Sequence, residues 1–426
     1  MATTQMSKPA EDVPSDLLKL IKKSGVLSDR QFEDLRTKVL AGDYPLDTRM
    51  LAQRLIRDRV LTEYQAGRLL KNKPHGLAVG KYVILDRLGS GSMGRVYKAN
   101  HLLMGRVVAL KVIAPEISSN SRVVSRFQRE MKLVGRLDHP NVVRAYDADQ
   151  LGSILYIVME YVSGHSLGQI FRERGPLRPI DVARYAADAA LGLAHAHAQG
   201  IVHRDIKPSN LLLGEDRRVR VLDLGLGVLV EVDEQATFAT ADGIAVGTVD
   251  YMSPEQACGR EVDGRSDLYS LGCTMYHIIS GRHVFPGNSP VERLGQRING
   301  TPTPLADLVP DLPAGMSEVM DRLLANKPRD RYQTAEEAAE ALERLLPGRA
   351  NLGRPAARAT EPSPAEPAEH KVVEVEVEVE PDFPAWFRPL AELAENSPLG
   401  AAIALLLGAL VFFGLGFFSA FVLLNR

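Results

Sequence analysis

The stretch that decides the fold lies at residues 203–210 and reads His-Arg-Asp-Ile-Lys-Pro-Ser-Asn. It places a carboxylate, Asp205, close in sequence to an ammonium group, Lys207, and a carboxamide, Asn210. Asp205 could accept the proton of an incoming hydroxyl group, Lys207 could neutralise a phosphoryl group as it moves, and Asn210 could hold a magnesium ion. The triplet that opens the run is common by chance, but the full run is not. It therefore predicts phosphoryl-transfer chemistry.

A glycine-rich turn upstream joins two runs that read as short β-strands. Gly89, Gly91 and Gly94 form the pattern Gly-x-Gly-x-x-Gly, and a β-like run that begins at Val96 returns from it. Glycine lets the backbone approach phosphates closely, where any Cβ would clash. A dinucleotide-binding turn has the same glycine spacing, but a helix follows it directly. Because a β-like run follows here, the pattern favours a loop that covers the phosphates of ATP.

A lysine in an apolar segment indicates a second part of the nucleotide site. Lys111 lies in the apolar run at residues 107–113, where an unpaired ammonium group would be costly. Its expected partner is Glu130, in an amphipathic helical run that also carries Phe127 and Val134. This ion pair would hold Lys111 against the α- and β-phosphates.

Two further segments complete the predicted nucleotide site. Residues 156–162 read as a buried strand that opens into a hinge between two lobes, with Met159 at the back of an adenine pocket. The backbone at Glu160 and Val162 could hydrogen-bond an adenine edge. Asp223 lies 18 residues after the carboxylate of the first motif and is the second expected metal ligand. Carboxylate and carboxamide oxygens are the hard ligands that magnesium prefers.

From about residue 80 to residue 345 the chain resembles a eukaryotic-type (Hanks-type) serine/threonine protein kinase of the kind that bacteria anchor in their membranes. The resemblance implies an α+β, bilobal fold with a β-rich N-lobe and a helical C-lobe. It implies transfer of the γ-phosphoryl group of ATP to Ser or Thr hydroxyls of protein substrates, with Mg²⁺ or Mn²⁺. Asp205 would be the catalytic base, Lys207 would contact the phosphoryl group, and Asn210 and Asp223 would hold the metal. The residues that would bind ATP are Leu88, Gly89, Ser90, Gly91, Ser92, Met93, Gly94, Val96, Ala109, Lys111, Glu130, Met159, Glu160 and Val162.

The resemblance extends to the segment that follows the metal ligands. Residues 253–255 read Ser-Pro-Glu where the family has Ala-Pro-Glu, and they would close the activation segment. Arg331 is then the expected partner of Glu255, and Asp267 is expected to brace the catalytic loop. One position departs from the family's Asp-Phe-Gly, because Leu224 replaces Phe. Leucine is apolar and can still pack under the regulatory helix, although with less area than phenylalanine.

The activation segment carries three threonines with different expected roles. Thr237 and Thr240 are expected autophosphorylation sites, because Arg204 beside the catalytic base could bind a phosphate on the segment and order it. Thr248 is expected in the loop that docks the substrate. Autophosphorylation would then activate the enzyme.

Residues 1–78 read as a separate helical module with a faint internal repeat at an offset of 34 residues. Ser28 and Thr62 are each followed three residues later by Gln, which is a helix-capping box. Two similar helical hairpins packed on each other are therefore expected. The period matches a tetratricopeptide array, but the aromatic and glycine pattern of that family is absent. The module either docks a regulatory partner at residues 1–75 or braces the kinase domain.

The kinase-like domain at residues 79–346 is followed by a segment rich in Pro, Ala and Glu at residues 347–398, which reads as a linker. Inside it, residues 371–380 alternate apolar and acidic side chains. This alternation fits either an extended acidic spacer or a half-buried strand. Residues 399–424 contain no charged side chain. Because roughly 20 apolar residues span a bilayer, this run predicts a transmembrane helix.

The predicted membrane helix implies a single-pass protein of the cell membrane. Its kinase domain would lie in the cytoplasm, because the ATP that it uses is found there. Gly400, Ala404 and Gly408 recur every fourth residue, a spacing that lets two helices approach closely and would permit a homodimer. The polar N-terminus has no apolar region of the kind found in a signal peptide.

Composition bounds the remaining functions. A chain of 426 residues is too long for one ordinary core, and its formal net charge of −2 gives no reason to expect a nucleic-acid partner. The two cysteines, Cys258 and Cys273, lack metal-ligand spacing. Two other function classes stay open, a pseudokinase scaffold and a membrane-tethered adaptor. No essential polar position of the kinase pattern is missing, so an active enzyme is the preferred interpretation.

Overall fold

The computed structural model describes residues 16–91, 93–115, 121–225 and 249–347. Its first half contains α1 (Asp16–Ser24), α2 (Asp29–Leu40), α3 (Thr48–Arg57), α4 (Glu63–Leu70), β1 (Ala78–Val79), β2 (Tyr82–Gly91), β3 (Gly94–His101), β4 (Val107–Ile113), α6 (Ser121–Val134), β5 (Ala145–Leu151) and β6 (Ile154–Glu160). Its second half contains β7 (Gly164–Ser166), α7 (Leu167–Arg174), α8 (Pro179–Ala198), β8 (Leu211–Gly214), β9 (Val219–Val221), α10 (Pro254–Ala257), α11 (Gly264–Ser280), α12 (Pro290–Asn299), α13 (Leu305–Leu308), α14 (Met316–Leu323) and α15 (Ala335–Arg344).

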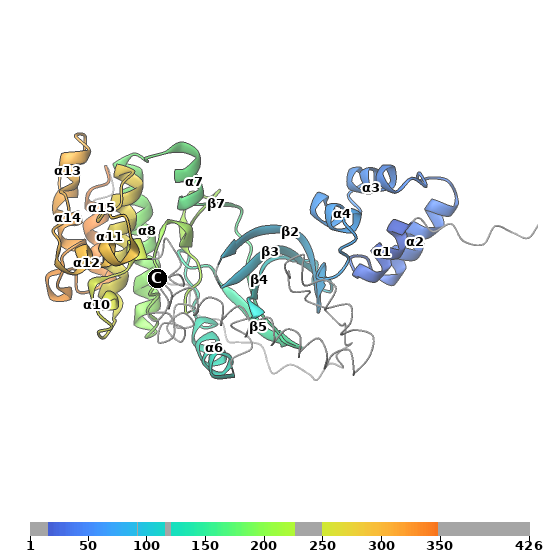
Figure 1. Ribbon diagram of the computed structural model, residues 1–426, viewed down its shortest axis with the longest axis horizontal. Helices are drawn as coiled ribbons and strands as arrows, with labels where there is room; N and C mark the ends of the chain where they lie inside the picture. The colour runs from blue at the N-terminus through green and yellow to red at the C-terminus, as the bar shows by residue number, and fades with distance from the viewer. Residues whose placement is uncertain (1–15, 92, 116–120, 226–248, 348–426) are drawn as a thin grey trace, which may run out of the picture. The chain divides into compact units, whose positions relative to one another are not determined.

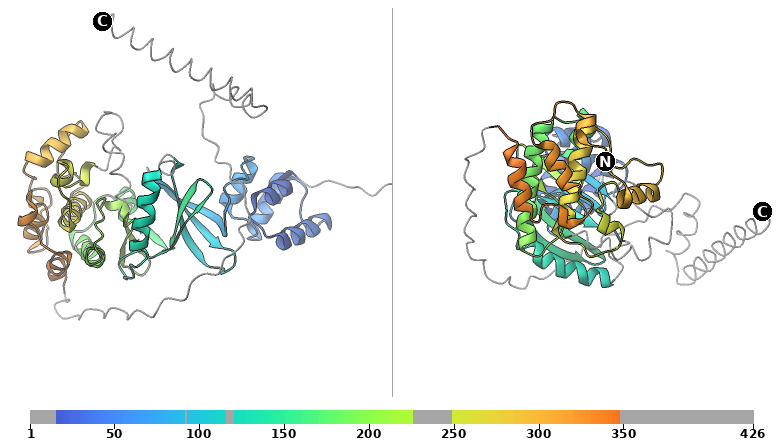
Figure 2. Two further views of the ribbon diagram at one scale, coloured as in Figure 1. Left: turned by 90° about the horizontal axis from the view of Figure 1, so that it is seen from below. Right: turned by 90° about the vertical axis from the view of Figure 1, so that its left-hand side faces the viewer.

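The β-rich lobe is an antiparallel sheet with the strand order β1-β2-β3-β4-β6-β5, and α6 lies against one of its faces (Figure 2). Nearly every residue of β4 is apolar. Since successive side chains point to opposite sides of a strand, β4 presents an apolar surface on both faces. Ala109 and Ile113 pack in the cluster that includes Phe127 of α6, whereas Val108 and Leu110 pack in the cluster on the other face. Lys111 has the same parity as Ala109 and Ile113, so the alternation places its side chain on the face that α6 covers.

The helical lobe is built around α8, which packs against α11, α15 and β9 (Figure 1). Helix α11 is buried along nearly its whole length, and α8 presents a row of buried alanines that allows close helix packing. A small second sheet has the order β7-β8-β9. The chain that joins α8 to β8, residues 199–210, carries the motif that opened the sequence analysis. The two lobes therefore have the α+β, bilobal arrangement that the sequence predicts.

Helices α1–α4 precede the sheet, and the two capping boxes that the sequence predicts are both present. Ser28 and Gln31 cap α2, and Thr62 and Gln65 cap α4, each pair bonding side chain to backbone in both directions. The apolar residues of the two hairpins form one core. Its fully buried members are Leu17, Ile21, Leu51, Ala52, Leu55, Leu69 and Leu77.

The helical unit is joined to the sheet by polar and apolar contacts with β2. Thr62 Oγ1 donates a hydrogen bond to the Leu85 carbonyl at 2.6 Å, and Gln65 Nε2 donates to the Ile84 carbonyl at 2.7 Å. Val83 of β2 belongs to the same apolar core as the helices. Strand β2 leads directly into the glycine-rich turn, so the helical unit supports the strand that positions that turn.

This contact gives a stability prediction with a matched control in the same repeat. Gln65 is buried and Gln31 is exposed, although both close the same type of capping box. Gln65→Ala should lower the free energy of unfolding by about 2 kcal/mol, because it leaves the Ile84 carbonyl without its donor. Gln31→Ala should cost less than about 1 kcal/mol, the usual worth of a cap. Urea unfolding of the two variants measures the difference, and equal losses would contradict a supporting role for α4.

Within the residues that the structure describes, no helix is both long enough and apolar enough to cross a bilayer. The predicted transmembrane run at 399–424 and the linker beyond residue 347 lie outside the described residues.

Candidate active site

The run at residues 203–210, the predicted catalytic loop, is held by a buried carboxylate of α11. Asp267 is fully buried and accepts hydrogen bonds from the backbone N–H groups of His203 and Arg204, both at 2.8 Å, and contacts His197 Nε2 at 2.8 Å. Burial acts to raise the pKa of Asp267, but its contacts with His197 and with the loop N–H group outweigh burial and lower that pKa. Asp267 therefore stays ionised and braces the loop, as expected. Arg204 is held at a positive φ of 65°, a left-handed conformation that these bonds must stabilise.

His203 connects the catalytic loop to the chain that follows β9. The Asp205 N–H group donates to Nδ1 of this buried ring at 3.2 Å, and the ring contacts the Leu222 carbonyl through Nε2 at 2.7 Å. One ring nitrogen must accept and the other must donate, so these partners assign a neutral ring with its hydrogen on Nε2. The ring thus fixes the spacing between Asp205 and the residue that follows Leu222, Asp223.

The three polar residues of the motif converge on one another. Lys207 Nζ lies 2.8 Å from Asp205 Oδ2, and Asn210 Nδ2 donates to Asp205 Oδ2 at 3.1 Å and to the Asp205 carbonyl at 2.7 Å. The Asp205 side chain keeps 15% of its surface exposed, so a hydroxyl group can reach it. Because Asn210 donates through its nitrogen, its Oδ1 atom, which accepts a long hydrogen bond of 3.5 Å from Ser209 Oγ, is the atom that a cation would use.

Lys111 pairs with Asp223, which corrects the partner expected from the sequence. Its Nζ atom lies 2.8 Å from Asp223 Oδ1, and among the described contacts no ion pair joins Lys111 to Glu130. The Lys111 side chain is only 5% exposed, so it needs a close carboxylate. Asp223 supplies it from a left-handed backbone conformation, with φ of 60°, whereas Glu130 lies half-buried on α6.

The pKa of Asp223 reflects two opposed effects. Burial acts to raise this pKa, but the charge and hydrogen bond of Lys111 lower it by more, so the group is held below its usual range. The carboxylate is therefore charged at neutral pH, which is the form that a metal ion binds.

Five apolar residues predicted to bind ATP gather in one cluster. Ala109 and Met159 are buried members of it, and Met93, Val96 and Val162 pack against it. Leu222 also packs there and was missed in the sequence, although its place in the apolar run directly before Asp223 could have indicated it. In the hinge, the Glu160 N–H group already donates to the Arg144 carbonyl at 2.9 Å, so the Glu160 carbonyl is the group left for an adenine edge.

The glycines of the turn differ in whether the protein leaves room for a side chain at their positions. A Cβ on Gly94 would collide with the Val112 carbonyl, and its φ is 136°, so glycine is needed there by the hairpin itself. A Cβ on Gly89 or Gly91 would meet no protein atom within 4 Å. The protein therefore leaves open the space beside these two residues, where the sequence predicts phosphate groups. Leu88 and Ser90 belong to the same strand, and Ser92 lies outside the described residues.

The oxygen donors fit a divalent cation bound together with a nucleotide. No group of three or more His, Cys, Asp or Glu side chains that could hold a metal occurs among the described residues. Asn210 and Asp223 would then supply the protein ligands and the phosphates would supply the rest, which is how magnesium is commonly held.

The departure at Leu224 is accommodated in the core. Leu224 is buried in the cluster that contains Val134 of α6 and Leu137, so it does pack under this helix. Gly225, at φ 76°, has no room for a side chain, because a Cβ would lie 2.6 Å from Val134 Cγ2.

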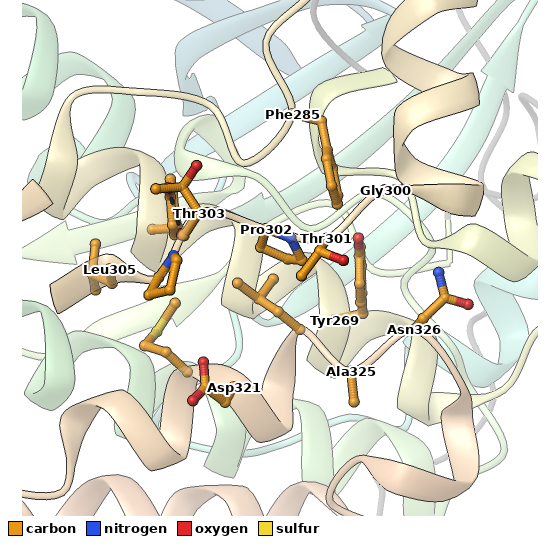
Figure 3. A pocket seen from close by; sticks show the side chains of 14 residues that line it. Tyr269, Phe285, Gly300, Thr301, Pro302, Thr303, Leu305, Asp321, Ala325 and Asn326 are labelled. Atoms are coloured by element: carbon orange, nitrogen blue, oxygen red, sulfur yellow. Dashed lines mark hydrogen bonds between the residues drawn. The ribbon is translucent and has the colours of Figure 1, made fainter. Parts of the chain in front are cut away.

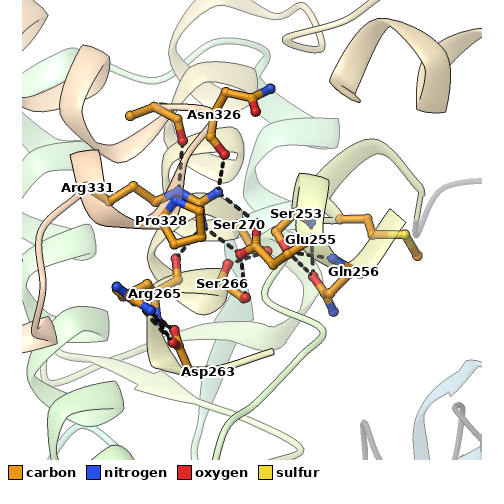
Figure 4. A network of polar contacts seen from close by, with 12 residues as sticks. Ser253, Glu255, Gln256, Asp263, Arg265, Ser266, Ser270, Asn326, Pro328 and Arg331 are labelled. Atoms are coloured by element: carbon orange, nitrogen blue, oxygen red, sulfur yellow. Dashed lines mark hydrogen bonds and ion pairs between the residues drawn. The ribbon is translucent and has the colours of Figure 1, made fainter. Parts of the chain in front are cut away.

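A buried ion pair in the helical lobe joins Glu255 to Arg331 (Figure 4). Glu255 accepts two hydrogen bonds from Arg331, at 2.7 and 2.8 Å, and a third from Ser266 Oγ at 2.5 Å. The remaining Arg331 donors bond the carbonyls of three residues, Arg265, Ala325 and Asn326. The pair expected between Glu255 and Arg331 is therefore confirmed. The three threonines of the activation segment, Thr237, Thr240 and Thr248, lie outside the described residues.

A separate cavity of about 350 Å³ lies in the helical lobe (Figure 3). Aromatic side chains of Tyr269, Tyr276 and Phe285 line it, together with the segment 300–305 and residues of α14. None of the residues predicted to bind ATP lines this cavity, so it is distinct from the candidate active site.

Comparisons with known proteins agree with this geometry. The protein kinase domain family matches residues 82–343. A probable serine/threonine-protein kinase of Corynebacterium efficiens is 37% identical over 300 residues, which covers 67% of this chain and 45% of that protein. Serine/threonine-protein kinase PknB of Mycobacterium tuberculosis is 36% identical over 272 residues, covering 63% of this chain and 43% of PknB. The matches thus span less than half the length of these relatives.

A solved structure gives the same result. The kinase domain of Mycobacterium tuberculosis PknI is 29% identical, with a TM-score of 0.51, and the match covers 64% of this chain and 99% of that domain. The family match spans more than half of the chain, and its relatives support a serine/threonine kinase function. The chain therefore belongs to the protein kinase domain family, and over the matched region it is similar to bacterial serine/threonine-protein kinases.

Proposed function

We propose that this protein is an ATP-dependent kinase that phosphorylates Ser and Thr residues of other proteins. The observation that carries the proposal is the convergence of Lys207 and Asn210 on Asp205, with Lys111 and Asp223 paired at 2.8 Å nearby. Each of these side chains has a role in phosphoryl transfer.

The side chains divide the chemistry among them. Asp205 accepts the proton of the substrate hydroxyl as its oxygen bonds to the γ-phosphorus, and Lys207 offsets negative charge on the moving phosphoryl group. Bound Mg-ATP supplies the phosphoryl group, and the bond from the γ-phosphorus to the bridging oxygen breaks to leave ADP. Asn210 and Asp223 would hold the cation, Mg²⁺ or Mn²⁺, which would offset charge on the phosphates, and Lys111 would bind the α- and β-phosphates.

The proposal is tested with the full chain, radiolabelled Mg-ATP and myelin basic protein as the acceptor. Label should appear on Ser or Thr and not on Tyr. Lys111→Met should lower the rate about 10²-fold or more, the usual effect of removing a charge that stabilises the transition state. Lys19→Met, on the exposed face of α1, is the matched control and should leave the rate unchanged. Nucleotide binding without transfer in the unaltered chain would instead indicate a scaffold.

Regulation is proposed to occur through the activation segment. Autophosphorylation at Thr237 or Thr240 would place a phosphate near Arg204, next to the catalytic base, and order the segment. Mass spectrometry of the active chain should find phosphate at one of these two threonines. Bare threonines in fully active protein would rule out this mode of activation.

The membrane and partner assignments are further parts of the proposal. Residues 399–424 would anchor the protein in the cell membrane as a single helix, with the kinase domain in the cytoplasm. The spacing of Gly400, Ala404 and Gly408 supports pairing of two such helices. The helical unit before the kinase domain would carry any regulatory partner, through the surface that does not contact β2.

A further inference from the structure

The turn that follows the activation segment is linked to the catalytic loop. Residues Val249–Tyr251 form a 3₁₀ turn, and α10 begins three residues later. Gln256 of α10 donates from Nε2 to the Arg204 carbonyl at 2.9 Å. Arg204 directly precedes Asp205, so this hydrogen bond places the turn and α10 beside the loop that an acceptor hydroxyl must approach.

A fully buried arginine of α12 hydrogen-bonds the backbone of this turn. Arg297 has no exposed surface, and it donates from Nη1 to the Met252 carbonyl at 2.6 Å and from Nη2 to the Asp250 carbonyl at 2.8 Å. The rings of Tyr269 and Phe285 lie 5.9 and 5.6 Å from its guanidinium carbon. Both rings also line the cavity in Figure 3.

Burial of the Arg297 charge carries a desolvation cost that an apolar side chain in the same place would not have. No carboxylate of the described residues forms an ion pair with Arg297, so its charge is buried against two carbonyls, the Cys273 Sγ atom at 3.5 Å and two ring faces. An apolar side chain of similar volume usually stabilises such a position at least as well. What an apolar side chain could not do is fix the carbonyls of Asp250 and Met252 at two points. The arginine therefore favours a defined turn shape over stability.

A second arginine of α12 holds the side chain of the same turn. Arg293 Nη1 lies 3.0 Å from Asp250 Oδ1, and His283 Nε2 lies 3.8 Å from Asp250 Oδ2. On the other side, Tyr251 Oη contacts His277 Nδ1 at 2.6 Å. Helix α12 thus fixes both the backbone of the turn and the Asp250 side chain, and α11 fixes the Tyr251 side chain.

We propose that Arg297 is a positioning residue for the protein substrate. By fixing two carbonyls it holds the turn 249–252 in the shape that receives the acceptor segment, whereas the groups that bind ATP and carry the proton lie elsewhere. Arg297 therefore governs the affinity for the acceptor protein and not the chemical step. This inference rests on the proposed kinase function.

The test separates acceptor binding from chemistry. In the full chain, Arg297→Gln should raise KM for myelin basic protein at least tenfold, with kcat and KM for ATP within twofold of the unaltered enzyme. An increase in KM at constant kcat indicates lost binding that is equal in the ground and transition states. Arg322→Gln is the matched control, because Arg322 also lies over a ring, 4.2 Å from that of Tyr332, on α14. It should change neither constant.

Each alternative result has one meaning. Equal changes in kcat and KM, or no change, in a folded Arg297→Gln variant would overturn the inference. If thermal unfolding shows that this variant does not fold, Arg293→Gln takes its place, since Arg293 is partly exposed. That variant should raise KM for the acceptor at least threefold at constant kcat, and an unchanged KM would overturn the inference. Absence of transfer in the unaltered chain would contradict the proposed function itself.

Discussion

Asp205→Asn should lower the rate constant for phosphoryl transfer about 10³-fold, or about 4 kcal/mol of transition-state stabilisation. An amide side chain cannot take up the hydroxyl proton, and it also removes the charge that holds Lys207 Nζ at 2.8 Å. The hydrogen bond from Asn210 Nδ2 can persist, because asparagine keeps an acceptor oxygen. The variant should therefore fold and bind nucleotide normally while losing chemistry. Single-turnover transfer from radiolabelled ATP measures this loss.

The same substitution elsewhere provides the control. Asp216 lies on the turn between β8 and β9 and pairs with Arg220 at 2.7 Å. Asp216→Asn makes the same chemical change outside the catalytic loop and should leave the rate within twofold. A rate in Asp205→Asn above one tenth of the original would assign the proton to another group.

Glu255→Gln should be the most destabilising single change that leaves the catalytic residues intact. It leaves the fully buried Arg331 guanidinium without its carboxylate, and breaking one side of a buried pair costs about 3–5 kcal/mol. For a domain of this size the loss corresponds to a fall in Tm of about 10 °C. Thermal unfolding followed by calorimetry measures it.

An exposed ion pair in the same network gives the comparison (Figure 4). Arg265 Nη2 lies 2.6 Å from Asp263 Oδ2, but half of the Asp263 side chain is exposed. Asp263→Asn should cost less than about 1 kcal/mol, because exposed pairs contribute little and asparagine can still cap α11. Similar losses in both variants would show that burial does not strengthen the Glu255 pair.

The pair between Glu255 and Arg331 also makes the protein sensitive to acid. Burial acts to raise the pKa of Glu255, but the hydrogen bonds and charge of Arg331 lower it below its usual range. A carboxyl group whose pKa is lower in the folded state contributes its full stability above the unfolded pKa, about 4.3 for Glu. That stability is lost as the pH falls through the lower, folded value. Glu255→Gln should therefore remove part of the acid dependence of Tm.

The catalytic loop could be predicted because its contacts form over a short stretch of chain. Lys207 and Asn210 reach Asp205 within the same run, so the order of residues nearly determines the geometry. The partner of Lys111 could not be predicted in this way. Glu130 and Asp223 are both carboxylates on distant segments, and only the placement of α6 and of the left-handed turn decides which one reaches the lysine.

Arg297 was missed for a related reason. Its helix, at residues 290–299, is largely polar, and an arginine in such a helix is normally taken as a surface residue. Its burial arises only when α12 packs against Tyr269 and Phe285, which come from other parts of the chain. Local sequence carries no signal of that packing. The ion pair of Glu255 was predictable because a resemblance supplied both members.

The apolar core that the N-terminal helices share with β2 affects how the protein can be dissected. The kinase family match begins at Tyr82, but Leu77 and Val83 are buried in one core with α1–α4. A fragment that starts at the family boundary would expose Val83 and strip the donors from the Ile84 and Leu85 carbonyls. Loss of activity after such a truncation would report damage to the strand that carries the glycine-rich turn, not the absence of a regulatory partner. Point changes on the exposed faces of α1–α3 keep that strand intact and separate the two effects.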